Sequence, residues 1–231
     1  MCRTRLKAVR PGGSGMIKSG ILLRILILLA LELCIPVRTE AAKQAADDTR
    51  IAAATAFRGD VYILSGGFGV FSTGLGKLKI QLEQKGVAAS LVSYQSWRGI
   101  SQKIVEHRRQ YGRKPIVIIG HSLGANNAIL IASALKKKGI QVDLIVSLAS
   151  TAPMTVPSNV RNVFNFYFES GGWGHIFKGE SGFAGRLNNV DMSNRPGMGH
   201  FTLDDSAELR DQVVRTVLRY VRPAKSAMAI R

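Results

Sequence analysis

The architecture of this chain can be read from one stretch, Lys114-Pro-Ile-Val-Ile-Ile-Gly-His-Ser-Leu-Gly124, and from the helix formers that follow it. The β-branched run Ile116–Ile119 predicts a buried strand, and residues 125–135 predict a helix. Between them lies G-x-S-x-G, in which a sharp strand-to-helix turn strains the central residue and leaves room only for small neighbours. The pattern predicts a nucleophilic Ser122. The alternative is a glycine-rich turn whose serine takes no part in chemistry.

Strand and helix patterns alternate from Asp60 onward. Such alternation with short connections predicts an α/β fold, a compact and mostly parallel sheet with helices on both faces. Residues 170–196 have no clear pattern and are long for a connection, which makes them a candidate lid or substrate wall. The predicted strands are 60–64, 87–94, 116–119, 142–148 and 160–168, and the predicted helices besides 125–135 are 75–85, 100–111 and 208–221.

A serine hydroxyl needs a nearby general base, because it is a poor nucleophile at neutral pH. His200 lies after the strand-like segments and just before the last helix, the place of the base in the chain order serine, acid, histidine. We therefore expect His200 to be the base, with His175 as the alternative. His121 directly precedes the serine, and we expect it to pack or form hydrogen bonds locally.

The serine turn, the glycine turn at residues 65–69 and the late Gly199-His200 resemble the α/β-hydrolase superfamily. Within it the chain resembles small lipases, esterases and thioesterases, over about residues 58–222. The resemblance implies a Ser-His-acid triad and an oxyanion hole built from the backbone N–H of Leu123 and of Phe68. Because glycine stands at 66 where the family usually has histidine, Gly67 is an alternative to Phe68.

The acid of the triad is the least determined residue. The loop after residues 142–148 reads Ala-Ser-Thr-Ala-Pro and has no carboxylate. Asp191, nine residues before His200, and Glu169, at the end of the preceding strand, are therefore both candidates, in that order. Asp204 and Asp205 lie close to the predicted last helix, which we expect them to cap.

The amino-terminal residues differ from the rest of the chain. Basic residues precede an apolar run, residues 21–35, which is typical of a signal peptide or a membrane anchor. We expect residues 1–45 to be this leader plus linker, 46–57 a linker, 58–222 the hydrolase-type domain and 223–231 a tail. Export to the periplasm or medium, with cleavage near Ala41 or Ala42, is the first expectation, and a retained anchor is the alternative.

The composition limits the partners. The formal charge is +17, so a basic surface attracted to anionic membranes is conceivable, while no pattern for binding nucleic acid is found. Both cysteines, Cys2 and Cys34, precede the domain. No metal-ligand spacing and no phosphate loop is present, so we expect neither a metal nor another cofactor.

Together these features predict an exported serine hydrolase that cleaves small carboxylic esters or thioesters through an acyl-enzyme on Ser122. Two alternatives stay open. One is a non-catalytic binding protein on the same fold, and the other is an acyltransferase that passes the acyl group to an alcohol.

Overall fold

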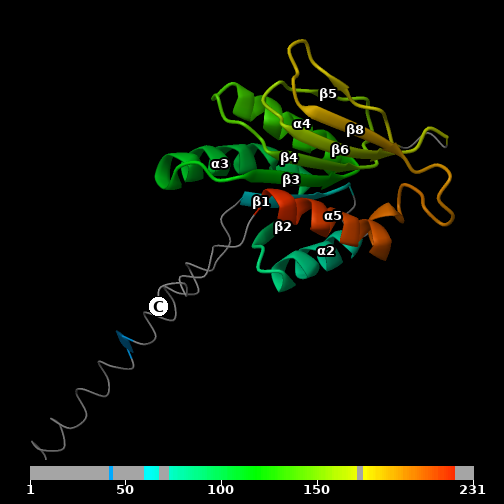
Figure 1. The fold of residues 1–231 in the computed structure, drawn as a ribbon, viewed down its shortest axis with the longest axis horizontal. Helices are drawn as coiled ribbons and strands as arrows, with labels where there is room; N and C mark the ends of the chain where they lie inside the picture. The colour runs from blue at the N-terminus through cyan, green and yellow to red at the C-terminus, as the bar shows by residue number, and fades with distance from the viewer. Residues whose placement is uncertain (1–41, 44–59, 68–72, 171–173, 222–231) are drawn as a thin grey trace, which may run out of the picture. The chain divides into compact units, whose positions relative to one another are not determined.

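The computed structural model describes residues 42–43, 60–67, 73–170 and 174–221 (Figure 1). The chain divides into two compact units, Met1–Ala52 and Ala53–Arg231, and the fold described below belongs to the second. The predicted leader lies almost wholly outside the described residues, as does the predicted tail. Within the described ranges, no helix combines the length and apolar character that crossing a membrane requires.

Six parallel strands form the main sheet, in the order β2-β1-β3-β4-β6-β8. The central strand β3 is buried along its whole length, as expected for a β-branched strand covered on both faces. The strands are β1 (Asp60–Ser65), β2 (Ala89–Ser93), β3 (Ile116–His121), β4 (Leu144–Leu148), β6 (Asn162–Tyr167) and β8 (Arg186–Asp191); β5 (Thr155–Val156) pairs with β7 (Lys178–Gly179) in a separate two-stranded sheet.

Helices cover both faces of this sheet (Figure 1). One apolar core joins a face of the sheet to α2 (Thr73–Gln84) and α5 (Ala207–Tyr220). A second joins the opposite face to α3 (Trp97–Tyr111) and α4 (Leu123–Lys136). A parallel sheet between two helical layers confirms the predicted fold class.

Two expectations about the carboxyl-terminal half are wrong. Residues 170–196 are not simply an irregular wall, because they contain β7 and the sixth strand of the main sheet, β8. The last helix is capped by Ser206, whose side chain accepts a hydrogen bond from the Leu209 amide, and not by the two aspartates before it. The aspartates contact α2 instead.

Candidate active site

The turn after β3 has the strained geometry that its sequence predicts. Ser122 has φ 57° and ψ −124°, a left-handed conformation that costs energy for a residue with a side chain. A Cβ on Gly120 would lie 2.2 Å from the Gly124 carbonyl oxygen, and one on Gly124 would lie 2.4 Å from the Leu64 carbonyl oxygen. Both glycines are therefore required for β3 and α4 to meet at this angle.

The structure brings Ser122 and His200 together. His200 Nε2 lies 3.0 Å from Ser122 Oγ, and both side chains are buried. Burial and then the charge of the neighbouring His121 lower the pKa of His200 to about 4. At neutral pH the imidazole is therefore uncharged and can accept the hydroxyl proton, as a general base must.

His121 holds the backbone of the base. Its Nε2–H donates to the His200 carbonyl oxygen over 2.7 Å, and the two imidazole rings are 5.3 Å apart. The side chain is 1% exposed. This agrees with the expectation of a local hydrogen bond, and it adds that the acceptor is the backbone of the base itself.

The glycine turn after β1 lies against the serine. A Cβ on Gly66 would lie 2.9 Å from Ser122 Cβ, and one on Gly67 would lie 3.2 Å from Leu123 Cδ1. Leu123 begins α4, and the amides of a first helical turn lack intrahelical acceptors and favour negative charge. The Leu123 amide thus has the position expected of an oxyanion donor, whereas Phe68, the predicted second donor, lies outside the described residues.

A hollow of about 500 Å³ opens beside this turn. Its lining combines backbone of the glycine turn with neutral polar side chains and one leucine. This gives a binding space next to the predicted oxyanion donors that carries no charged side chain among the described residues. The lining residues are Ser65, Gly66, Gly67, Ser93, Tyr94, Gln95 and Leu123.

The two predicted acids lie together at the ends of β6 and β8. Asp191 Oδ1 accepts hydrogen bonds from the Ser193 amide and hydroxyl and from the Glu169 amide. The bonds from Ser193 are the main cause that lowers the pKa of Asp191. Asp191 and Glu169 are both exposed. The hydrogen bonds of Asp191 thus lead to its own turn and to the end of β6, so its role as the triad acid stays a prediction, as does that of Glu169.

The loop after β4 is built without a carboxylate. Ala149, fully buried, has φ 51°, in the left-handed region. Asn126 on α4 fixes the next residues, since its Oδ1 accepts from the Ser150 hydroxyl and the Thr151 amide and its Nδ2 donates to Thr151 Oγ1. These bonds attach the loop to the helix that begins at the nucleophile.

One buried carboxylate near the base was assigned a different role by sequence reasoning. Asp204 is 1% exposed, and its Oδ2 accepts from the Leu75 amide in the first turn of α2. Burial raises the pKa of Asp204, and the nearby His121 partly offsets that rise. No local signal could have placed it, because α2 and residue 204 meet only through the tertiary fold.

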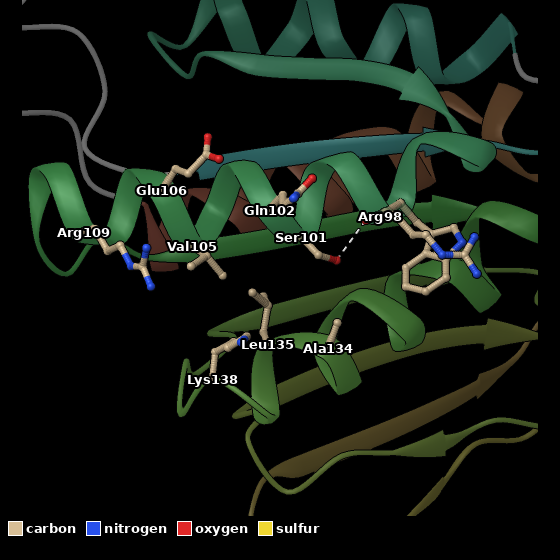
Figure 2. Close-up of a pocket in the computed structure, with 10 residues that line it drawn as sticks. Arg98, Ser101, Gln102, Val105, Glu106, Arg109, Ala134, Leu135 and Lys138 are labelled. Carbon is tan, nitrogen blue, oxygen red and sulfur yellow. Dashed lines mark hydrogen bonds between the residues drawn. The ribbon is translucent and has the colours of Figure 1, made fainter.

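A second hollow, of about 420 Å³, lies between α3 and α4 (Figure 2). Its buried hydroxyl, Ser101, donates to the Trp97 carbonyl within α3, and no histidine lines it. It therefore lacks the pair of groups that a serine nucleophile needs. Among the described residues no cluster of potential metal ligands is found either.

Comparison with known proteins relates the chain to one family. A family model described as a thioesterase domain matches residues 75–162, a stretch that contains Ser122 and ends before His200. No curated protein matches the chain. The match confirms the resemblance to thioesterases within the α/β hydrolases.

Two solved structures resemble the fold more distantly. One is described as a hydrolase of the alpha/beta superfamily from Xanthomonas campestris pv. campestris, with 16% identity and a TM-score of 0.39 over 70% of this chain and 99% of that one. The other is the RedJ thioesterase of the prodiginine biosynthetic pathway in Streptomyces coelicolor, with 11% identity and a TM-score of 0.43 over 71% of this chain and 91% of that one.

Proposed function

We propose that this protein is an exported serine hydrolase that cleaves carboxylic esters or thioesters through an acyl-enzyme on Ser122. The observation that carries the proposal is the 3.0 Å contact between Ser122 Oγ and His200 Nε2. The lowered pKa of His200 supports it, since the base is neutral at physiological pH. The resemblance to thioesterase domains supports the choice of an acyl substrate.

The proposed reaction has two halves. Ser122 Oγ attacks the acyl carbonyl while His200 Nε2 takes the hydroxyl proton, and the Leu123 amide donates to the oxyanion. The carbon–oxygen or carbon–sulfur bond then breaks, and the proton passes from His200 to the departing alcohol or thiol. Water, activated by His200, attacks the acyl-enzyme and releases the carboxylic acid, which restores the free serine.

The substrate is small and neutral where it meets the hollow beside the turn. That hollow has about 500 Å³ and is lined by hydroxyl, amide and backbone groups of Ser65, Tyr94 and Gln95 among others. Such groups form hydrogen bonds with an uncharged polar ligand but offer no counter-charge to a phosphate. We therefore expect short acyl esters or thioesters to be cleaved faster than phosphate-bearing ones.

A kinetic panel tests the proposal. Short-chain p-nitrophenyl esters and matching acyl thioesters are offered to the wild type, to Ser122→Ala and to the control Ser101→Ala, which removes another buried serine. We expect kcat to fall more than a thousandfold in Ser122→Ala and to stay near wild type in Ser101→Ala. A folded wild type that turns over neither substrate class would favour the binding-protein alternative, and acyl transfer to an added alcohol in preference to water would favour the acyltransferase.

Export is the part of the proposal that rests on sequence alone. The basic residues before the apolar run 21–35 support it. Amino-terminal sequencing of the protein isolated from its natural host tests it directly. A mature chain that begins near Ala41 or Ala42 is the expected result, and an intact leader recovered with the membrane fraction would favour the anchored alternative.

A further inference from the structure

Three buried titratable side chains gather behind the nucleophile. His200 is 7% exposed, and His121 and Asp204 are each 1% exposed. The proposed reaction uses only His200. A buried carboxylate costs several kcal/mol unless something compensates for the lost water, so the presence of Asp204 beside the two histidines calls for a physical reason.

The neighbours of Asp204 leave much of its charge uncompensated by hydrogen bonds. Its Oδ2 accepts from the Leu75 amide at 3.2 Å. Its Oδ1 is buried and has no hydrogen bond within the described part of the chain. A neutral asparagine would satisfy the Leu75 amide equally well, so the cap of α2 does not by itself explain a carboxylate.

Nearby cations are bound to other groups. Lys77 pairs with the side chain of Asp205, at 3.0 Å. Arg210 donates to the backbone carbonyl oxygens of Asp204 and Asp205. The group whose positive charge stabilises the Asp204 carboxylate is His121, and this attraction opposes the burial that raises the pKa of Asp204.

His121 in turn is bonded to the base. Its Nε2–H donates to the His200 carbonyl oxygen at 2.7 Å, shorter than an ordinary N–H···O bond. That carbonyl belongs to the residue whose imidazole meets Ser122. A carboxylate that favours one orientation of the His121 ring therefore also fixes the backbone that carries the base.

We propose that Asp204 is a positioning residue: its buried charge holds the His121 ring so that Nε2–H donates to the His200 carbonyl, which places the His200 imidazole against Ser122. The proposal rests on the proposed hydrolase function only in naming His200 as the base. The arrangement is a relay from Asp204 through His121 to the backbone of His200, separate from any acid that contacts the imidazole of His200.

Asp204→Asn tests the relay, because it keeps an oxygen for the Leu75 amide and removes only the charge. Asp205→Asn is the matched control, since it removes a neighbouring carboxylate that is exposed and bound to Lys77 and Thr73. In the full-length protein we expect Asp204→Asn to lower kcat for a p-nitrophenyl ester about tenfold with KM unchanged, and Asp205→Asn to stay within twofold of wild type. Wild-type kcat in Asp204→Asn would overturn the proposal.

A double-mutant cycle distinguishes positioning from a general structural role. If Asp204 acts through His121, then Asp204→Asn in a His121→Asn background lowers kcat no further. The same tenfold loss in that background would overturn the proposal, because the effect would then bypass His121.

Nitrogen-15 NMR of the histidine rings gives a readout that needs no catalysis. We expect a slowly exchanging Nε2–H signal that is absent in His121→Asn, exchanges at least tenfold faster in Asp204→Asn and is unchanged in Asp205→Asn. Equal exchange in wild type and Asp204→Asn would overturn the relay. Because this signal is read without substrate, it is decided separately from the hydrolase proposal, which fails if the wild type cleaves no ester or thioester.

Discussion

Ser122 owes its position to backbone geometry more than to side-chain contacts. Its φ of 57° is kept because β3 and α4 are both packed into the core on either side of it. The strain lifts Oγ toward His200, 3.0 Å away. Local strain at a functional position is tolerated where the surrounding structure stabilises it, and here two glycines without Cβ atoms allow that structure to close.

The two glycines of the turn give a stability prediction. Gly124→Ala places a Cβ 2.4 Å from the Leu64 carbonyl oxygen, which forces α4 away from β1 and should lower the free energy of unfolding by about 3 kcal/mol. Gly76→Ala is the control, because no atom lies within 4 Å of its added Cβ and alanine is favoured in a helix by about 0.5–1 kcal/mol. Urea unfolding of both variants measures this, and equal stabilities would contradict the geometry.

The pH dependence of hydrolysis tests the buried state of His200. Burial disfavours the imidazolium and lowers the pKa of His200 to about 4, so the basic form predominates down to that pH. We expect kcat/KM to keep most of its value at pH 5 and to reach half of it near pH 4. An acid limb with a midpoint near 6.5, the ordinary histidine value, would show that His200 is hydrated in the working enzyme.

The strand β8 shows why part of the fold could not be predicted. Its sequence, Arg-Leu-Asn-Asn-Val-Asp, has two adjacent asparagines that are typical of turns, and most of its residues are exposed. It becomes a strand because it pairs in parallel with β6 along six positions, from Asn162 with Arg186 to Tyr167 with Asp191. Such pairing is a tertiary effect that local residue patterns do not contain.

Buried asparagines connect these strands to the segment that follows β6. Asn165 Oδ1 accepts from the Ser147 hydroxyl, and its Nδ2 donates to the His175 carbonyl and to Asn189 Oδ1. Asn189 in turn bonds both backbone polar groups of Phe177. The network thus attaches residues 175–177 to the sheet at its carboxyl-terminal half.

Replacing the central asparagine should release that segment. Asn165→Leu leaves Ser147, His175 and Asn189 without these hydrogen bonds, and we expect a loss of about 3 kcal/mol in unfolding free energy. Asn188→Leu, an exposed neighbour on β8, should change it by less than about 0.5 kcal/mol. Thermal or urea unfolding measures both. A larger loss in Asn188→Leu than in Asn165→Leu would contradict the role of the network.

The elements with strong local patterns were predictable. The β-branched β3, the serine turn and the amphipathic α5 each follow from sequence periodicity, and the parallel sheet follows from their alternation. The serine and its base were predictable from chain order. The position of Asp204 beside His121 was not, because it depends on how α2 docks against residues 203–205.

Taken as a whole, the molecule is a parallel sheet between two apolar cores, with its chemistry at the carboxyl ends of the strands. The glycine turn after β1, the serine after β3 and the loop after β8 approach one another there. Ligands of open parallel sheets bind at this edge. The account therefore depends on whether the hydroxyl of Ser122 is activated.

Active-site labelling measures that activation most directly. The folded full-length protein is treated with a fluorophosphonate, and the modified residue is located by mass spectrometry of its peptides. The account predicts a single adduct on Ser122, absent in Ser122→Ala and retained in Ser101→Ala. A folded wild type that takes up no label, or a label on another serine, would contradict it.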